Sequence, residues 1–157
     1  MAKQEVPLME TICFGAGCFW HVEEAFARLP GVQTATGYGG GRTPHPTYAD
    51  VCAGTTGHAE LVQVRYDPAQ IPLERLLAAF WRLHDPTAVA GTQYRSAIFC
   101  TTREQLQAAE FSARRHAYGM RLKRPMRTEI APAPTFWRAE EEHQRFYSKQ
   151  RAKRVVP

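Results

Sequence analysis

Apolar residues recur along the chain with two different periods, and each change of period predicts where an element of structure begins. A short apolar run at 11–14 predicts a strand, and the segment after it keeps helical spacing to about Leu29. Residues 61–66 alternate between apolar and polar side chains, which is the pattern of a strand with one buried face. The apolar residues of 73–81 return to helical spacing and predict an amphipathic helix.

The full order of elements indicates the class of fold. The first six match the split β-α-β arrangement of ferredoxin-like proteins. We therefore predict an α+β fold, with a mixed, largely antiparallel sheet and flanking helices. The predicted elements are a strand at 10–14, a helix at 18–29, strands at 31–37 and 61–66, a helix from Pro72 to about 84, a strand at 96–101, a helix at 102–119, a strand at 127–131 and a helix at 139–149.

The composition is that of an ordinary globular domain, with 44% hydrophobic and 22% charged residues among 157. We expect one domain over 1–157, with flexible tails at 1–9 and 150–157. No apolar run approaches the ~18 residues that span a membrane, and residues 1–5 lack the apolar core of a secretory signal. We therefore expect a cytoplasmic protein without membrane contact, and we further expect a monomer.

Charge and cysteine spacing exclude further classes of function. The net charge of +5 is modest, and the basic residues are not interleaved with aromatic ones, so nucleic-acid binding is not expected. The four cysteines, at positions 13, 18, 52 and 100, show neither a Cys-x-x-Cys pair nor zinc-type spacing. We expect free thiols in a reducing compartment and no structural metal.

Cys18 falls where the first strand gives way to the first helix, after Gly15 and Gly17. We place it on the first turn of that helix. Unpaired backbone N–H groups and the helix dipole favour a thiolate there, so we predict a lowered pKa and a nucleophilic sulfur. The alternative is a small buried hydrophobe at a helix start.

Three further side chains are candidates from their positions. Glu60 has the parity of the apolar face of 61–66, so its carboxyl should lose solvation, keep its proton and serve as a proton donor. The alternative is that it turns to solvent at the strand start. Trp20 lies off the apolar face beside Cys18, either as a pocket wall or as a surface residue. Tyr48 is a candidate hydrogen-bond donor in an ordered loop at 42–50.

Six fragments, taken in order, resemble peptide methionine sulfoxide reductase A. They are Gly17-Cys18-Phe19-Trp20 and the segments 37–41, 46–48, 57–60, 84–87 and 91–96. The similarity runs from about residue 11 to residue 144. Each fragment alone is weak, but the ordered set is specific.

The resemblance implies a thiol-dependent enzyme that reduces the S epimer of methionine sulfoxide, free or in proteins, and so repairs oxidised proteins. Cys18 matches the family's nucleophile, which becomes a sulfenic acid, and Glu60 matches its proton donor. No bound cofactor and no metal is implied.

The resemblance also implies a substrate pocket. Phe19 and Trp20 match the apolar pocket for the substrate's methyl group. Tyr48 and Tyr94 match the hydroxyls that hydrogen-bond the sulfoxide oxygen. These roles agree with the chemistry of the residues, because aromatic walls exclude water and hydroxyl donors stabilise charge on oxygen.

The chain departs from the family pattern in three places. Only residues 88–90 separate two of the fragments, and Val89 holds an acidic position. His21 follows Trp20, where glycine is common. No cysteine follows Cys100 to serve as a C-terminal recycling thiol.

The route by which Cys18 is regenerated therefore stays open. We expect an external thiol (thioredoxin, glutaredoxin or a small thiol) to reduce Cys18 directly. Cys52 is the internal candidate for a resolving thiol. Cys13 and Cys100 fall in apolar strands and are expected to be inert.

Two rival functions follow from the same residues. Cys18 with His58 or His84 would suit a cysteine hydrolase or acyltransferase. A non-enzymatic thiol redox sensor would need Cys18 but no proton donor.

Overall fold

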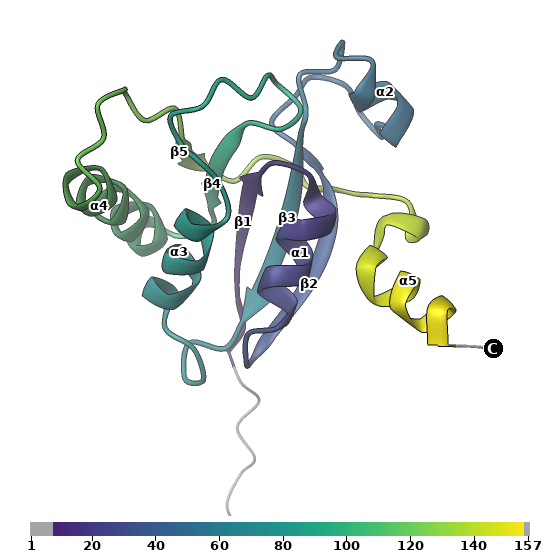
Figure 1. The fold of residues 1–157 in the computed structure, drawn as a ribbon, viewed down its shortest axis with the longest axis horizontal. Helices are drawn as coiled ribbons and strands as arrows, with labels where there is room; N and C mark the ends of the chain where they lie inside the picture. Colours follow the sequence, from purple (N-terminus) through teal and green to yellow (C-terminus); the bar gives the residue numbers. More distant parts are fainter. Residues whose placement is uncertain (1–7, 156–157) are drawn as a thin grey trace, which may run out of the picture.

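A six-stranded sheet is the centre of the protein, and the computed structural model describes residues 8–155 (Figure 1). Its order is β5-β4-β1-β3-β2-β6, with every neighbouring pair antiparallel except β4 and β5. The inner order β4-β1-β3-β2 is that of the split β-α-β fold, which confirms the predicted class. The strands are β1 (Glu10–Ala16), β2 (Val32–Gly39), β3 (Ala59–Tyr66), β4 (Ser96–Cys100), β5 (Glu129–Pro132) and β6 (Trp137–Arg138).

Helices α1 and α3 connect the inner strands and lie over one face of the sheet (Figure 1). The ring of Phe14 on β1 joins them, because it stacks on Phe26 of α1 at 4.7 Å and on Phe80 of α3 at 5.3 Å. The helices are α1 (Phe19–Ala27), α2 (Tyr48–Cys52), α3 (Leu73–Arg82), α4 (Arg103–Gly119) and α5 (Phe146–Val155), with a short 3₁₀ helix, η1 (Glu141–His143). No helix among residues 8–155 is long and apolar enough to cross a membrane.

The segment predicted as an ordered loop at 42–50 is partly helical, because α2 begins at Tyr48. Thr47 and Asp50 form a capping box, in which each side chain accepts a hydrogen bond from the other's backbone N–H. This local signal was present in the sequence. Pro72 also differs from its predicted place, since it precedes α3 as the N-cap residue.

The C-terminal prediction was wrong in its boundaries. In place of one helix at 139–149 the chain forms η1 and then α5, interrupted at Arg145, whose φ of 52° is left-handed and cannot continue a helix. Strand β6 was not predicted. Residues 150–155 are helical where a tail was expected, and residues 1–7 and 156–157 of the expected tails lie outside the described residues.

Gln144 attaches this C-terminal segment to β2. Its buried side-chain amide accepts a hydrogen bond from Thr36 N at 2.8 Å and donates to Thr36 O at 2.9 Å and Ala139 O at 3.0 Å. One side chain thus pairs both backbone groups of a buried strand residue.

We predict that Gln144→Met lowers the free energy of unfolding by about 3 kcal/mol, because Thr36 N and Ala139 O lose their Gln144 partner, whereas Thr36 O keeps its hydrogen bond from Ala139 N. Urea denaturation followed by circular dichroism measures the change. The exposed Gln107→Met on α4 is the matched control and should shift stability little. Equal stability of the two variants would show that Gln144 does not hold the segment.

Candidate active site

Cys18 is half-buried at the N-cap of α1, separated from the end of β1 by Gly17 and one residue before the predicted place in the first helical turn. Gly17 makes this turn with a φ of 100°, which only glycine adopts readily. A Cβ at Gly17 would also lie 3.3 Å from the His21 ring. His21, the departure noted after Trp20, therefore packs against the turn that presents the sulfur.

The pKa of Cys18 is raised, so the prediction of a lowered pKa was wrong. Burial is the main cause, and the nearby Glu60 carboxylate adds to it. Hydrogen bonds from the backbone N–H groups of Trp20 and His21 lower the pKa, as expected at a helix start, but they do not outweigh burial. The resting sulfur at neutral pH is therefore mainly a thiol.

Glu60 is 1% exposed, which confirms that strand alternation turns it inward. Its Oε1 accepts a hydrogen bond from Phe19 N at 3.1 Å and its Oε2 accepts one from Gln93 Nε2 at 2.6 Å. Burial raises the pKa of Glu60, and these two donors oppose the rise. The carboxyl is thus fixed beside the residue that follows Cys18, in surroundings that favour its protonated form.

The two groups affect each other's ionisation. A charged Glu60 raises the pKa of Cys18, so protonation of Glu60 removes that contribution and favours the thiolate. When a single proton is shared between Cys18 and Glu60, one arrangement therefore places it on Glu60 and leaves Cys18 as a thiolate. A nucleophile and a proton donor are the two groups needed to cleave a polar bond to oxygen.

Tyr48 and Tyr94 lie near this pair. Burial raises the pKa of Tyr48, and a hydrogen bond with Cys52 and the nearby Glu60 raise it further. Burial also raises the pKa of Tyr94, followed by the charges of Glu60, Cys52 and Cys18. Both phenols therefore keep their protons at neutral pH and remain hydrogen-bond donors.

The other three cysteines differ sharply in exposure. Cys52 is exposed, and its sulfur accepts a hydrogen bond from Gln93 Nε2 at 3.3 Å. Cys13 and Cys100 are buried, and burial raises their pKa values to about 12 and about 11. Such thiols are poor nucleophiles at neutral pH, in agreement with the expectation that both are inert.

Gln93 is a site residue that the sequence analysis did not single out. Its backbone carbonyl accepts a hydrogen bond from Glu60 N at 2.8 Å, and its amide reaches both the Glu60 carboxyl and Cys52. The neighbouring Arg95 fixes this loop, donating to Thr92 O at 2.8 Å and Gly57 O at 3.0 Å. The fragment 91–96 was the available signal, although it did not distinguish Gln93 from its neighbours.

The aromatic residues after Cys18 pack against the C-terminal segment. Phe19 is 1% exposed and lies 5.5 Å, centroid to centroid, from His143. Trp20 is half-buried and stacks on Phe146 at 3.8 Å. Trp20 is thus covered by α5 on one face, which favours the pocket-wall interpretation over the surface one.

Glu140 connects the same segment to Tyr48. It accepts hydrogen bonds from the Tyr38 hydroxyl and from Tyr48 N, each at 2.9 Å. Glu140, Glu142 and His143 also have potential metal-ligand atoms within 4.8 Å of one another. Glu140 already accepts from Tyr38 and Tyr48, and His143 accepts from Trp20. We therefore assign these side chains to hydrogen bonds within the protein and not to a metal site. Spacing alone gave no signal for them.

Two imidazoles considered as bases for a hydrolase are engaged elsewhere. His58 Nδ1 accepts from Gly41 N at 3.0 Å, and its Nε2 contacts Thr43 O at 2.7 Å. Both nitrogens of His84 are also occupied, by Phe80 O at 3.2 Å and Ser96 Oγ at 2.6 Å. Neither histidine bonds Cys18, which a thiol–imidazole pair requires.

Val89, at the acidic position of the family pattern, is 79% exposed in the short loop before Gly91.

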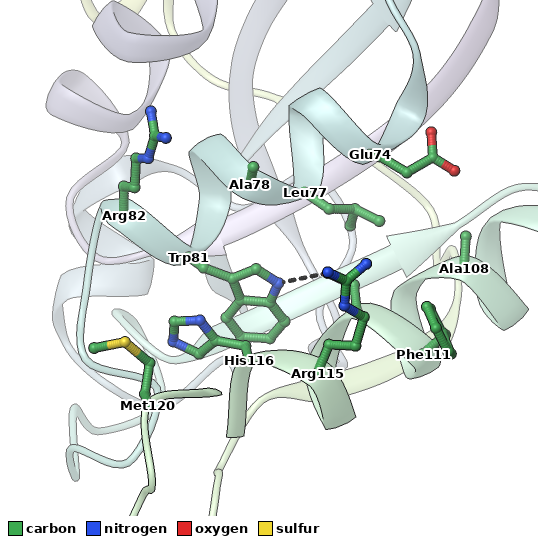
Figure 2. A pocket seen from close by; sticks show the side chains of 11 residues that line it. Glu74, Leu77, Ala78, Trp81, Arg82, Ala108, Phe111, Arg115, His116 and Met120 are labelled. Atoms are coloured by element: carbon green, nitrogen blue, oxygen red, sulfur yellow. Dashed lines mark hydrogen bonds between the residues drawn. The ribbon is translucent and has the colours of Figure 1, made fainter. Parts of the chain in front are cut away.

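A cavity of about 760 Å³ lies elsewhere, between α3 and α4 (Figure 2). Trp81 is one of its lining residues, and its indole N–H donates to Ser112 Oγ at 2.8 Å. None of the predicted site residues lines this cavity.

Comparisons with known proteins agree with one another. Residues 10–156 match the family described as peptide methionine sulfoxide reductase. The chain is 51% identical over 149 residues to peptide methionine sulfoxide reductase MsrA of Methanoculleus marisnigri, covering 90% of this chain and 91% of that protein.

Solved structures give the same result. Methionine sulfoxide reductase A of Corynebacterium diphtheriae has a TM-score of 0.82 at 37% identity, covering 93% of this chain and 77% of that one. Reduced Mxr1 of Saccharomyces cerevisiae has a TM-score of 0.84 at 30% identity, covering 96% and 92%. Mxr1 has also been solved in complex with Trx2.

We predict that Glu60→Gln lowers the pKa of Cys18, because the substitution removes a charge that raises it and keeps an oxygen to accept from Phe19 N. The pH dependence of Cys18 alkylation by iodoacetamide, followed by mass spectrometry, measures this pKa. An unchanged or higher pKa in the variant would contradict the coupling.

Proposed function

The chain belongs to the peptide methionine sulfoxide reductase family, and from this membership we propose that it reduces the S epimer of methionine sulfoxide, free or in proteins, at Cys18. The observation that supports the site assignment is the buried Glu60 carboxyl, which is held by the N–H of the residue after Cys18. Repair of oxidised proteins follows from this activity.

The reaction begins with a polarised sulfoxide, whose sulfur is positive and whose oxygen is negative. The Cys18 thiolate attacks the sulfur while Glu60 gives its proton to the oxygen. Tyr48 and Tyr94 donate hydrogen bonds to the same oxygen and stabilise its charge. The attack forms a bond between Cys18 Sγ and the substrate's sulfur, which then carries the protonated oxygen as a hydroxyl. The hydroxyl passes to Sγ: the sulfur–sulfur bond and the substrate's sulfur–oxygen bond break, a bond between Sγ and oxygen forms, methionine leaves, and Cys18 becomes a sulfenic acid.

The substrate's methyl group occupies an apolar pocket beside the sulfur. Phe19 and Trp20 form this pocket, and Trp20 supplies the wall that Phe146 supports from behind. Aromatic walls bind a methyl group and exclude water, so the electrostatic contacts to the sulfoxide oxygen strengthen.

An external thiol restores the enzyme. Its thiolate attacks the sulfenic sulfur of Cys18, water leaves and a mixed disulfide forms, which a second thiol then cleaves. The complex of Mxr1 with Trx2 supports a thioredoxin-type protein as this reductant, with glutaredoxin or a small thiol as alternatives. Cys52, exposed and bonded to Gln93, is the internal candidate for a resolving thiol.

The rest of the proposal combines the composition of the chain with what its family membership implies. We infer a cytoplasmic monomer that needs no bound cofactor or metal and binds neither nucleic acid nor membranes. Its partners are oxidised proteins or free methionine sulfoxide, together with the reductant.

The proposed activity is tested with the two separated epimers of a methionine sulfoxide substrate and excess dithiothreitol. We expect methionine from the S epimer alone, no turnover by Cys18→Ser, and full turnover by the control Cys13→Ala. Activity on neither epimer, or hydrolysis of esters without reductant, would overturn the proposal.

We predict that Glu60→Gln lowers kcat/KM about 100-fold near neutral pH, since a positioned proton donor is typically worth at least this much. Wild-type activity should fall as pH rises through the raised Glu60 pKa, because the donor form is then lost. An inert Glu60→Gln would favour the redox-sensor alternative.

The route of regeneration is tested by Cys52→Ser with thioredoxin as the only reductant. Direct reduction of Cys18 predicts turnover within about twofold of wild type. Loss of thioredoxin-dependent turnover, with dithiothreitol-dependent turnover retained, would instead make Cys52 the resolving thiol.

A further inference from the structure

His143 makes a specific hydrogen bond inside the proposed substrate pocket. It lies 123 residues after Trp20 in the chain, and its Nδ1 accepts the Trp20 indole N–H at 3.0 Å. The side chain is buried, with 6% exposure. An indole N–H has one proton and no acceptor capacity, so this contact satisfies the only polar group of Trp20.

The imidazole ring also packs against the neighbouring aromatic residues. Its centroid lies 4.4 Å from that of Tyr48 and 5.5 Å from that of Phe19. His143 therefore contacts three of the four residues proposed to bind substrate, although His143 itself lies outside the six family fragments.

His143 itself is held rigidly. Its backbone carbonyl accepts from Thr36 Oγ1 at 3.2 Å, and its N–H donates to Glu140 O at 2.9 Å. The next residue, Gln144, bonds both backbone groups of Thr36. The imidazole is thus fixed to β2, in the same sheet that carries Glu60.

Trp20 is constrained from two directions. Phe146 stacks on its face at 3.8 Å with the rings within 7° of parallel, while His143 bonds its edge. Stacking alone permits an aromatic ring to slide or rotate in its plane, whereas a hydrogen bond to the indole nitrogen fixes that rotation.

We propose that His143 is a positioning residue, which orients Trp20 for the methyl group of the sulfoxide substrate. This inference rests on the proposed function of the site. His143 acts through Trp20 and has no hydrogen bond to Cys18 or Glu60, so its loss affects substrate binding more than chemistry. If the Trp20 indole is correctly oriented in only a fraction of the molecules, the apparent affinity of the enzyme for the sulfoxide is the intrinsic affinity multiplied by that fraction.

Two substitutions distinguish the role of His143 as a hydrogen-bond acceptor from the role of its aromatic ring in packing. His143→Phe keeps an aromatic ring against Tyr48 but removes the acceptor. His143→Asn removes the ring but places an amide oxygen near the position of Nδ1. We expect His143→Phe to raise KM for the S sulfoxide about tenfold, the usual worth of one buried hydrogen bond, with kcat within about twofold. His143→Asn should keep KM within about threefold of wild type.

A second measurement needs no substrate. Nuclear magnetic resonance detects the Trp20 indole N–H, assigned by its loss in Trp20→Phe. We expect slow hydrogen exchange of this proton in the wild type and in His143→Asn, and fast exchange in His143→Phe. Adding His143→Phe to the Trp20→Phe variant should raise KM no further, because the bond is already absent.

His116→Phe is the matched control, since His116 also stacks on a tryptophan, Trp81, at 4.9 Å, but lies on α4. Its KM should equal that of wild type. Equal KM values for His143→Phe and wild type, or a larger KM for His143→Asn than for His143→Phe, would overturn the inference. Wild-type protein without sulfoxide reduction would instead refute the proposed function, and the exchange measurement would still decide whether His143 fixes Trp20.

Discussion

The hydrogen bond from Phe19 N to the buried Glu60 carboxyl is the contact on which the site depends. It joins the start of α1 to β3 at the point where the chain presents Cys18. A carboxyl in that position is desolvated, so it keeps its proton more readily than in water. The same burial raises the pKa of Cys18, and the two groups therefore ionise in competition. Reactivity depends on how one proton is shared between them.

The C-terminal segment packs against the aromatic residues that we propose as the substrate pocket beside this pair. Glu140 holds Tyr38 and Tyr48, His143 holds Trp20, and Gln144 attaches all of them to β2. The four inner strands of the sheet come from residues 10–100, but the aromatic residues beside Cys18 are covered only when this later segment folds back onto them. We therefore expect the stability of this segment and the affinity of the proposed site for substrate to be linked.

Sequence patterns predicted the fold well where burial follows a simple period. The inner strands, α1, α3 and α4 appear near their predicted positions, and alternation correctly turned Glu60 inward. Periodicity did not predict β6, which has two residues, or the break at Arg145. The capping box of α2 was visible in the sequence, but two prolines made a loop the natural interpretation.

The site was predicted less completely than the fold, for a physical reason. A helix start favours a thiolate, but its effect on Cys18 depends on burial, which is set by packing from distant parts of the chain. Three residues of the site act through hydrogen bonds to distant parts of the chain: Gln93 bonds Glu60, Glu140 bonds Tyr48 and His143 bonds Trp20. The partners are separated by 33, 92 and 123 positions in the sequence, so no local spacing predicts these pairs. Family fragments pointed to Cys18 and Glu60 as the proposed reacting residues, whereas the structure showed which residues hold them in place.

Transfer of the substrate's oxygen to Cys18 is tested by a single turnover without reductant. Enzyme is mixed with excess S sulfoxide, and the methionine released is quantified. Sulfenic acids on the protein are trapped with dimedone, and the modified cysteines are mapped by mass spectrometry. We expect one methionine per enzyme and a dimedone adduct on Cys18, which marks the sulfenic acid formed by the proposed attack. No methionine, or an adduct confined to another cysteine, would contradict it.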